Sequence, residues 1–468
     1  MIDLLEAHDS SSLAILDCRD GSGISYGCLR ERVGAAAEQL TRQAEGSVTF
    51  LVSTNTIDSI VLYLACLEAS IPVCLLEPFG NEPPKRLIEA YRPRTMLVPP
   101  GTAAPEQASS EEVFDGTRYR ICTLPVYEAD PPAHPDLALL LTTSGSTGTP
   151  KLVRLTLKNV LANARSIVTY LGLDESERSI QGLPMYYSYG LSLINSHLLA
   201  GGTVVLTAHS FLRPEFWTDF NGAQCTSFAG VPYMYETLDR LGFEPASHPS
   251  LRTMTQAGGG LRRELIRAFH LKAVNARVRL YIMYGQTEAT ARIAYVPHET
   301  LGEKIGSIGI AIPGGRMDVA AVPGMDASEL VYTGPNVMMG YADSAQALAL
   351  GDELKGVLHT GDLVERDSDG FFYLTGRLKR FAKLFGRRIS LAEVENELES
   401  TFPLRAAVVE GNQQLRVFIE AKGDVDPAAV SGYLARSLKL LPKFVIVSAI
   451  NSLPLTANGK KDYKVLCG

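Results

Sequence analysis

The sequence predicts an α/β fold, with a large N-terminal region of helix-flanked sheets and a small α+β region after it. Two observations support this prediction. Strand–helix–strand patterns recur along the first part of the chain, and after Gly376 short helices and strands alternate more compactly. The length of 468 residues also exceeds what one compact core usually serves, so at least two domains are expected.

Three strand–helix–strand units are expected in the first region. In the first, residues 48–52 and 71–76 are predicted strands and residues 57–69 have helical spacing. The second covers residues 181–206, and the third ends in a strand at 278–283. Strands that alternate with helices predict largely parallel sheets.

One stretch of the first region, residues 99–135, is predicted to form loops. It is rich in Pro, Ala, Ser and acidic residues, which are typical of connections between units.

The C-terminal region begins after a short basic segment, Arg377 to Arg380. Helices are expected at 389–398 and 427–438, with strands at 406–409 and 415–419. The chain is therefore divided into residues 1–378 and residues 379–468.

The composition narrows the possible partners and location. The net charge is −7, from 44 basic and 51 acidic residues, and no basic stripe suggests nucleic acid or an anionic membrane. The seven cysteines are scattered without paired spacing, as in reduced cytosolic proteins. The acidic N-terminus does not resemble a signal peptide, and no apolar run could span a bilayer. A cytoplasmic location is expected.

The strongest functional signal is a glycine-rich loop between two apolar strands. Glycines let backbone N–H groups approach an oligophosphate, hydroxyls add donors, and a lysine neutralises charge. The loop does not fit GxxxxGK[ST], because Pro150 precedes the lysine and Leu152 follows it. A flexible linker is the alternative, but linkers seldom lie between buried strands. The candidate phosphate-binding residues are Thr143, Ser144, Gly145, Ser146, Thr147, Gly148 and Lys151.

This loop resembles the phosphate-binding signature of the superfamily of acyl-CoA synthetases, peptide-synthetase adenylation domains and luciferases. Further segments follow in the family's order: Tyr284-Gly285-Gln286-Thr287-Glu288, Gly334 to Tyr341, Thr360-Gly361-Asp362 with Gly376-Arg377, Gly386-Arg387-Arg388-Ile389, and Pro454 to Lys460. The resemblance implies an adenylate-forming ligase that uses ATP and Mg²⁺. It implies an N-terminal adenylation core and a small mobile C-terminal domain that carries the catalytic lysine.

The resemblance also implies roles for the nucleotide site. Glu288 is expected to bind Mg²⁺, since a hard cation prefers carboxylate oxygens. Thr287 is expected to direct a hydroxyl toward the α-phosphate, and Tyr284, in one motif with Gly285 and Gln286, is expected to stack on adenine. The triplet Gly258, Gly259 and Gly260 resembles the family's tight turn beside nucleotide and acid, although a plain loop would explain it equally well.

The ribose and the reacting phosphate involve residues near the domain boundary. Asp362 is expected to accept both ribose hydroxyls, with support from Arg377. Lys460 is the expected catalytic lysine of the first half-reaction, because its ammonium can reach the attacking carboxylate and the α-phosphate together. Lys379 takes the hinge position, and Arg388 belongs to the expected nucleotide-binding set.

The segment Leu183 to Gly190 resembles the family's acyl-pocket motif, with Tyr187 where CoA ligases often have histidine. No Asp or Glu lies between Gln181 and Gly202, so an acid without an α-amino group is favoured, because a buried ammonium needs a partner. A largely neutral pocket lining is expected. Its candidate residues are Tyr187, Ser188, Phe228, Ala229, Gly230 and Met283.

The acceptor remains open between coenzyme A, a free-standing carrier protein and an amine. A separate acceptor is expected, since no carrier domain is recognised after Lys460, and the rather short region before the glycine-rich loop favours a carrier protein slightly. Other possibilities are an amino-acid-activating enzyme, a luciferase-like oxygenase and a catalytically silent relative. A P-loop ATPase or kinase is disfavoured because the Walker A sequence is missing.

Overall fold

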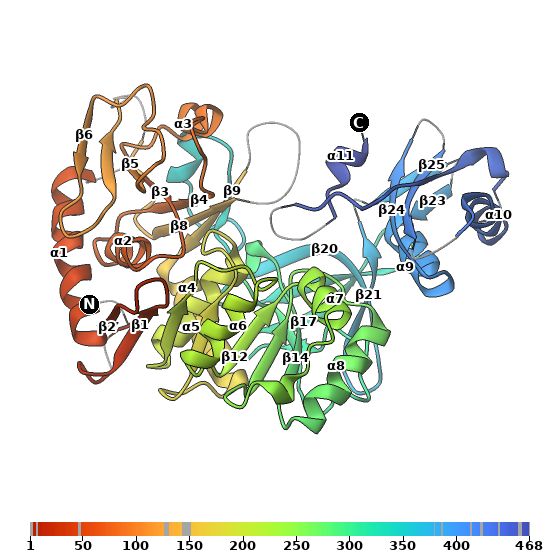
Figure 1. Cartoon of the computed structure of the whole chain (residues 1–468). Coiled ribbons are helices and arrows are strands. Elements are labelled where there is room, and N and C mark those ends of the chain that lie inside the picture. Colours follow the sequence, from red (N-terminus) through yellow and green to blue (C-terminus); the bar gives the residue numbers. More distant parts are fainter. Residues whose placement is uncertain are drawn as a thin grey trace.

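The structure is a computed structural model that describes most of the chain. The described residues are 3–5, 8–44, 48–125, 131–142, 151–378, 380–384, 387–411, 414–421, 425–438, 440–456 and 461–467. Figure 1 shows two sheets and their helices on one side and a smaller C-terminal unit on the other.

The first sheet has the strand order β19-β9-β8-β4-β3-β5-β7-β6. The central pairs β3–β4, β3–β5 and β4–β8 are parallel, and the pairs toward both edges are antiparallel. Its strands are β3 (Thr49–Val52), β4 (Val73–Leu76), β5 (Thr95–Val98), β6 (Ser110–Val113), β7 (Arg120–Thr123), β8 (Leu137–Thr142), β9 (Leu152–Thr156) and β19 (Gly340–Ala342). The predicted parallel arrangement is confirmed at the centre of this sheet.

The prediction of loops over residues 99–135 is wrong in part, because β6 and β7 lie within it. In β7 the side chains of Ile121 and Cys122 are buried, whereas all four residues of β6 are exposed. The strand β6 therefore has no hydrophobic pattern of its own, and it forms by antiparallel pairing with β7.

The second sheet has the order β16-β15-β14-β13-β12-β10-β11-β1-β2 and is parallel from β1 to β14. Its strands are β1 (Leu13–Asp17), β2 (Gly23–Ser25), β10 (Arg178–Gln181), β11 (Thr203–Leu206), β12 (Ser227–Gly230), β13 (Thr253–Gln256), β14 (Arg279–Tyr284), β15 (Ala294–Val296) and β16 (Ile310–Ala311). Because these strands run parallel, the loops that follow them all leave from the same edge of the sheet.

Helices fill the space between the two sheets and cover the far side of the second. One hydrophobic core joins α1, α2, α4 and α5 to strands of both sheets. The helix α4 begins with a reciprocal capping box between Thr156 and Asn159 and ends at Gly172 in the left-handed region. The helices of this region are α1 (Tyr26–Ala44), α2 (Ile57–Glu68), α3 (Lys85–Tyr91), α4 (Leu157–Leu171), α5 (Ser188–Leu199), α6 (Pro214–Gly222), α7 (Pro232–Arg240) and α8 (Arg263–Asn275).

A third, antiparallel sheet leads to the C-terminal unit. It has the order β17-β18-β20-β21, with β17 (Arg316–Ala321), β18 (Ser328–Thr333), β20 (Val357–Arg366) and β21 (Phe372–Arg377). The sequence did not predict these strands individually, since most of them expose one face and their pairing is long-range.

The C-terminal unit has a hydrophobic core of its own. It contains the hairpin β22 (Phe381–Leu384) and β23 (Arg387–Ser390), the sheet β24 (Leu404–Glu410), β25 (Leu415–Ala421) and β26 (Val445–Ala449), and the helices α9 (Leu391–Thr401), α10 (Pro427–Ser437) and α11 (Tyr463–Cys467). The predicted helix at 389–398 begins two residues later because Ile389 and Ser390 pair with β22. Arg405 of β24 reaches back to Glu236 of α7, with Nε 3.6 Å from Oε2.

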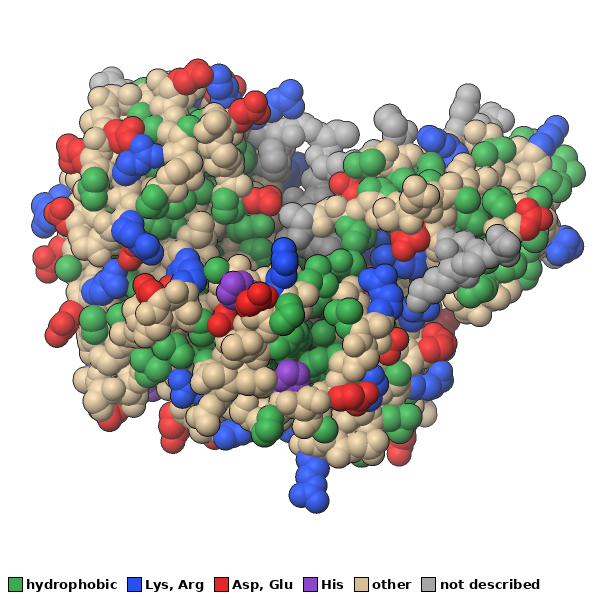
Figure 2. All heavy atoms as spheres, in the orientation of Figure 1, with side chains coloured by type: hydrophobic (Ala, Val, Ile, Leu, Met, Phe, Trp, Pro, Cys, Tyr) green, Lys and Arg blue, Asp and Glu red, His purple; other side chains and the backbone are tan. Residues whose placement is uncertain are grey.

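Charged side chains of both signs lie on the surface, as the composition predicts. On the face seen in Figure 2, acidic and basic side chains occur over both parts of the molecule. Among the helices that the structure describes, none combines the length and apolar character needed to cross a bilayer.

Candidate active site

The candidate site lies where loops leave the carboxyl ends of parallel strands. The strands β10, β12, β13 and β14 run parallel and end at Gln181, Gly230, Gln256 and Tyr284. Loops that leave one edge of a parallel sheet meet there, and this edge is the usual place for a ligand. The acyl-pocket segment, the glycine triplet and the 284–288 motif therefore belong to one edge.

Glu288 lies in a short 3-10 turn, Thr287–Ala289. Its Oε1 accepts a hydrogen bond of 2.7 Å from the hydroxyl of Tyr341, and its backbone oxygen accepts one of 2.9 Å from the amide of Met338. The Nζ atom of Lys151, just after the glycine-rich loop, lies 6.0 Å from the centre of the Tyr341 ring. One exposed ring thus lies beside both the predicted metal ligand and the loop lysine.

The sequence motif around Gly334 positions this turn through Asn336, which is 1% exposed. Its Nδ2 donates to the backbone oxygens of Ala289 and Arg292 at 2.8 and 2.9 Å, and its backbone oxygen accepts from the hydroxyl of Thr290 at 2.8 Å. Thr290 has φ of 65°, which is uncommon for a residue with a side chain. We conclude that Asn336 holds the turn containing Glu288 in its shape.

Asp362 is 1% exposed, and each of its two carboxylate oxygens has a partner. Its Oδ2 accepts from Gln286 Nε2 at 2.7 Å and from the hydroxyl of Tyr284, and its Oδ1 lies 2.6 Å from Nε of Arg377. Burial, reinforced by the Asp362 carboxylate, raises the pKa of Tyr284 well above its usual value. The phenol therefore stays protonated and donates to the carboxylate.

This network joins the predicted ribose residues to the predicted adenine motif. It also means that the Tyr284 hydroxyl occupies an oxygen that the sequence assigned to ribose. The Tyr284 side chain is buried, 8% exposed, so little of its ring is available for stacking in this arrangement.

Thr287 and Tyr187 connect the nucleotide motif to the acyl-pocket segment. The Thr287 hydroxyl lies 3.4 Å from the hydroxyl of Ser188, the first residue of α5. A Cβ on Gly258, whose φ is +86°, would lie 2.5 Å from the hydroxyl oxygen of Tyr187. The amide of Gln256 donates to the backbone oxygen of Gly259 at 2.9 Å and closes this turn. The triplet is thus a tight turn around Tyr187, and Gly258 is required there.

Gly285 is needed for a different reason. A Cβ at this position would lie 1.8 Å from the backbone oxygen of Ala291. After Glu288 the chain turns back, so that the backbone of Ala291 packs directly against Gly285, just after the end of β14.

The predicted pocket residues fall into two groups. The pairing register places Ala229, Thr255 and Tyr281 side by side, so Met283, two residues after Tyr281, points to the same face. On this face the hydroxyl of Tyr170 donates to Sδ of Met283 at 2.9 Å.

The structure does not bring Phe228 to this group. Its ring packs with Phe216 and Trp217 of α6 and with Tyr235 of α7. Gly230 lies close to the same cluster, because a Cβ there would be 2.9 Å from the Tyr235 ring. The sequence could not separate the two faces, since adjacent positions of a fully buried strand are both apolar.

The neutral lining expected for the pocket stays a prediction, but a charged side chain, Arg292, lies close to the acyl-pocket segment. Arg292 is 2% exposed, and its guanidinium carbon is 4.1 Å from the centre of the Tyr189 ring. The sequence signal was a single arginine within Ala289-Thr290-Ala291-Arg292-Ile293-Ala294, a run of small and apolar residues. A charge inside such a run is unusual, and only the fold shows where it points.

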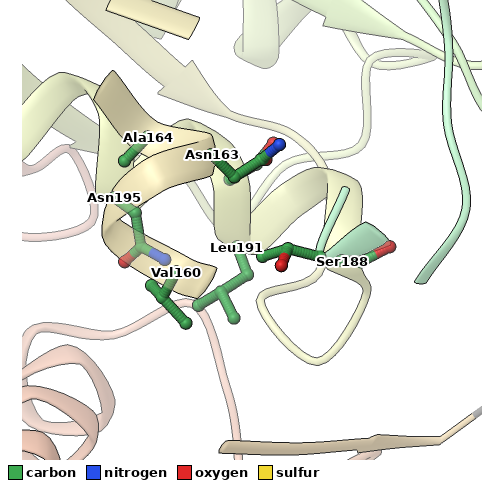
Figure 3. A pocket seen from close by; sticks show the side chains of 8 residues that line it. Val160, Asn163, Ala164, Ser188, Leu191 and Asn195 are labelled. Carbon is green, nitrogen blue, oxygen red and sulfur yellow. The ribbon is translucent and has the colours of Figure 1, made fainter. Parts of the chain in front are cut away.

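A cavity adjoins the site between α4 and α5, as Figure 3 shows. Val160, Asn163 and Ala164 come from α4, and Ser188, Leu191, Ser192 and Asn195 come from α5, with Thr290 completing the lining. The Oδ1 atoms of Asn163 and Asn195 are buried and accept no hydrogen bond from the described residues. A more open groove lies at the ends of β3, β4 and β10, lined by Asn55, Glu77 and Tyr186 among others.

Several predicted residues lie outside the described part of the chain. They are Thr143, Ser144, Gly145, Ser146, Thr147 and Gly148 of the glycine-rich loop, the hinge residue Lys379 and the catalytic candidate Lys460. Arg388 lies in β23, where it pairs with Lys383. Gly260 is exposed and a Cβ there would meet nothing within 4 Å.

These features define a nucleotide-binding α/β enzyme with its site at a parallel sheet edge. The sequence matches the family described as AMP-binding enzyme over residues 7–342, and the chain belongs to this family. The feruloyl-CoA synthase of Amycolatopsis sp is 31% identical over 376 residues, which cover 73% of this chain and 73% of that protein. The probable CoA ligase CCL9 of Humulus lupulus is 27% identical over 490 residues, covering 95% of this chain and 91% of that protein.

A solved structure has the same fold. O-succinylbenzoate coenzyme A synthetase (MenE) from Bacillus subtilis, in complex with ATP and magnesium ion, matches with a TM-score of 0.72 and 22% identity, covering 96% of this chain and 95% of that one. The predicted superfamily and fold class are confirmed. The predicted enzyme class, an ATP-dependent acid–thiol ligase, is confirmed by the relatives.

Proposed function

We propose that this protein activates a carboxylic acid with Mg·ATP and transfers the acyl group to a phosphopantetheine thiol, that of coenzyme A or of a free-standing carrier protein. One observation carries the proposal. Three consecutive side chains each touch a different predicted part of the site: Gln286 contacts Asp362, Thr287 contacts Ser188, and Glu288 contacts Tyr341. A motif of this kind can bring nucleotide, acid and metal together.

In the first half-reaction, a carboxylate oxygen of the acid attacks the α-phosphorus of ATP. The bond to the β-phosphate breaks, pyrophosphate leaves, and acyl-AMP remains. Lys460 is proposed to neutralise charge on the attacking carboxylate and the α-phosphate, and Thr287 to donate its hydroxyl there. The glycine-rich loop, residues 143–148 with Lys151, is proposed to bind the outgoing phosphates.

Glu288 fits a magnesium ligand of the kind that shares the ion with a substrate. Within the described residues, no group of three or more His, Cys, Asp or Glu side chains could hold a metal by itself. Mg²⁺ commonly binds through one or two carboxylates together with substrate phosphates and water. Bound in this way, Mg²⁺ would supply positive charge beside the phosphates.

The nucleoside is proposed to lie between the end of β14 and the middle of β20, where Asp362 lies. Asp362 accepts the ribose hydroxyls, Arg377 supports the carboxylate, and the Tyr284 hydroxyl gives up its place on Oδ2. A ribose hydroxyl takes the place that the Tyr284 hydroxyl leaves, so the carboxylate keeps its hydrogen-bond donors throughout the exchange.

In the second half-reaction, the acceptor thiolate attacks the acyl carbonyl and AMP leaves. We propose that residues 379–468 form a mobile domain on the core of residues 1–378, with the hinge at Lys379. In one orientation Lys460 meets the phosphate, and in the other the segment around Gly386 and Arg388 faces the acceptor. The C-terminal unit's separate hydrophobic core supports this division. A cytoplasmic location belongs to the same proposal.

The proposal is tested by pyrophosphate release over a panel of carboxylic acids, followed by intact-mass analysis with coenzyme A and with holo carrier proteins. If no acid releases pyrophosphate, the protein is a silent relative and the proposal fails. An acyl-AMP that reacts with amines and with neither thiol would instead support the amide-forming alternative.

Lys460→Ala separates the half-reactions. It is expected to abolish acid-dependent pyrophosphate exchange, because the charge at the α-phosphate is lost, while transfer from synthetic acyl-AMP continues. Lys461→Ala is the neighbouring control for the exchange reaction, since the Lys461 ammonium is bound to Glu399 at 2.8 Å and to the backbone oxygen of Ala406 at 2.6 Å. Equal loss of both half-reactions in Lys460→Ala would contradict the assignment.

A further inference from the structure

Arg292 places a positive charge in the part of the fold that faces the proposed acid pocket. Its guanidinium lies against the ring of Tyr189, the second residue of α5. The Tyr189 hydroxyl donates to the backbone oxygen of Thr255 at 3.1 Å, and its ring contacts that of Tyr187. Thr255 pairs with Ala229 on the sheet face that also carries Met283. The guanidinium therefore lies against α5 at Tyr189, a residue that is hydrogen-bonded to the second sheet.

Within the described part of the chain, this charge has no ionic partner. Among the described residues, no carboxylate oxygen lies within 4.0 Å of an Arg292 nitrogen, and its buried Nε donates no hydrogen bond. By contrast, Arg154, the most deeply buried arginine of the core, binds Glu353 and the backbone oxygens of three residues. A buried, unpaired charge is costly, so proteins keep one mainly where a ligand supplies the partner.

The neighbouring tyrosines do not provide a negative charge for Arg292. Burial raises the pKa of Tyr187 and of Tyr189 to about 12, although the Arg292 charge opposes the rise in both. Burial likewise raises the pKa of Tyr170, against the charge and hydrogen bond of Arg292. All three phenols are therefore neutral at pH 7, so none of them supplies the negative charge that would balance Arg292. The stacking of Arg292 on Tyr189 stabilises the cation in part but leaves its charge unneutralised.

We infer that the acid activated by this protein carries a second anionic group, a carboxylate or sulfonate, which binds Arg292 at the inner end of the pocket. The inference rests on the proposed function and specifies its substrate class. The reacting carboxylate would lie toward Thr287 and Ser188, and the second group would lie against Arg292. A dicarboxylic or sulfocarboxylic acid satisfies both ends.

Matched pairs of acids test the inference in the full-length protein. Pyrophosphate release is measured for succinate against butyrate, glutarate against pentanoate, and terephthalate against para-toluate. A site that binds a polar group rejects an analogue without it strongly, so for at least one pair the dianionic acid is expected to have a kcat/KM about 100-fold higher or more. If a neutral acid is preferred in every pair, the inference is wrong while the proposed function stands. If no acid in a broad panel reacts, the proposed function itself fails.

Two variants assign the preference to Arg292. Arg292→Met is expected to remove most of the preference for the dianionic acid, and Arg292→Lys is expected to retain part of it. Without substrate, Arg292→Met is expected to unfold at the same temperature as the unaltered protein or a higher one, because an unpaired buried charge is removed. The dianionic acid should raise the unfolding temperature of the unaltered protein and not that of Arg292→Met.

Arg178→Met is the matched control. Arg178 also has a buried Nε without a partner in the described residues, but it lies at the opposite end of β10 from the site. The variant Arg178→Met is expected to leave the preference for the dianionic acid unchanged. If Arg292→Met unfolds at a much lower temperature without substrate, or slows dianionic and neutral acids equally, Arg292 is a structural residue and the inference is overturned.

Discussion

Replacing Asp362 by asparagine keeps the size of the side chain and removes a charge on which three donors converge. Hydrogen bonds to a charged group contribute about 1.5–3 kcal/mol each, roughly twice a neutral bond. The amide nitrogen of asparagine can turn toward Arg377, which is 58% exposed and can move away at a cost of about 1 kcal/mol or less. The bonds from Tyr284 and Gln286 then persist as neutral ones, each weakened by about half.

The expected loss in the free energy of unfolding is therefore about 2–4 kcal/mol. It is measured by urea unfolding followed by circular dichroism. ATP affinity, measured by calorimetry, is expected to fall by about 10- to 100-fold, since each lost 1.4 kcal/mol is a factor of ten. Asp318→Asn in β17 is the control, because its ion pair with Arg316 is exposed and should contribute less than about 0.5 kcal/mol.

Tyr284→Phe separates stability from binding in this network. It deletes only the hydroxyl that competes with ribose for Oδ2, so it is expected to lower stability by about 1.5–3 kcal/mol but to weaken ATP binding much less than Asp362→Asn does. The reasoning is refuted if Asp362→Asn unfolds at the unaltered midpoint, or if it binds ATP as tightly as the unaltered protein.

Two further substitutions test the packing around the site. Gly285→Ala is expected to lower the free energy of unfolding by about 3 kcal/mol, because the added Cβ would lie 1.8 Å from the backbone oxygen of Ala291. In the control Gly260→Ala the added Cβ meets nothing within 4 Å, so the urea midpoint should shift little. Equal urea midpoints for the two variants would contradict this prediction. His197 is fully buried, and burial lowers the pKa of its imidazole in the folded protein. As the pH falls below about 6.5, the imidazole therefore becomes protonated in the unfolded chain before it does in the folded one, and the free energy of unfolding declines with decreasing pH. His197→Gln should reduce that decline by up to about 1.4 kcal/mol per pH unit, measured by urea unfolding between pH 7 and 5, and an unchanged slope would assign it to other groups.

The parts of the site that could be predicted are those whose signal is local. The loop at 143–151 and the motif at 284–288 carry their chemistry within a few consecutive residues, so glycine, hydroxyl and carboxylate positions could be read directly. The helix at 57–68 likewise has its own capping threonine, Thr56, and its own apolar pattern. Parallel strands followed from the alternation of such local elements.

Other features depend on pairing between distant segments and had no local signal. The exposed strand β6 exists because β7 pairs with it, and Phe228 faces away from Met283 because the sheet register orients the two strands. The hydrogen bond from the Tyr284 hydroxyl to the Asp362 carboxylate joins residues that are 78 positions apart in the sequence.

By itself, then, the sequence determined the α/β class, the order of the motifs and the expected ATP chemistry, because neighbouring residues determine strand, helix and loop propensities. The tertiary structure decided which side chains meet. It brought Tyr341 to Glu288, closed the glycine turn around Tyr187, and buried Arg292 against Tyr189 with no carboxylate partner among the residues described. The physical reason is that the environment of a charge, and hence its free energy, depends on residues that only folding brings within a few ångströms.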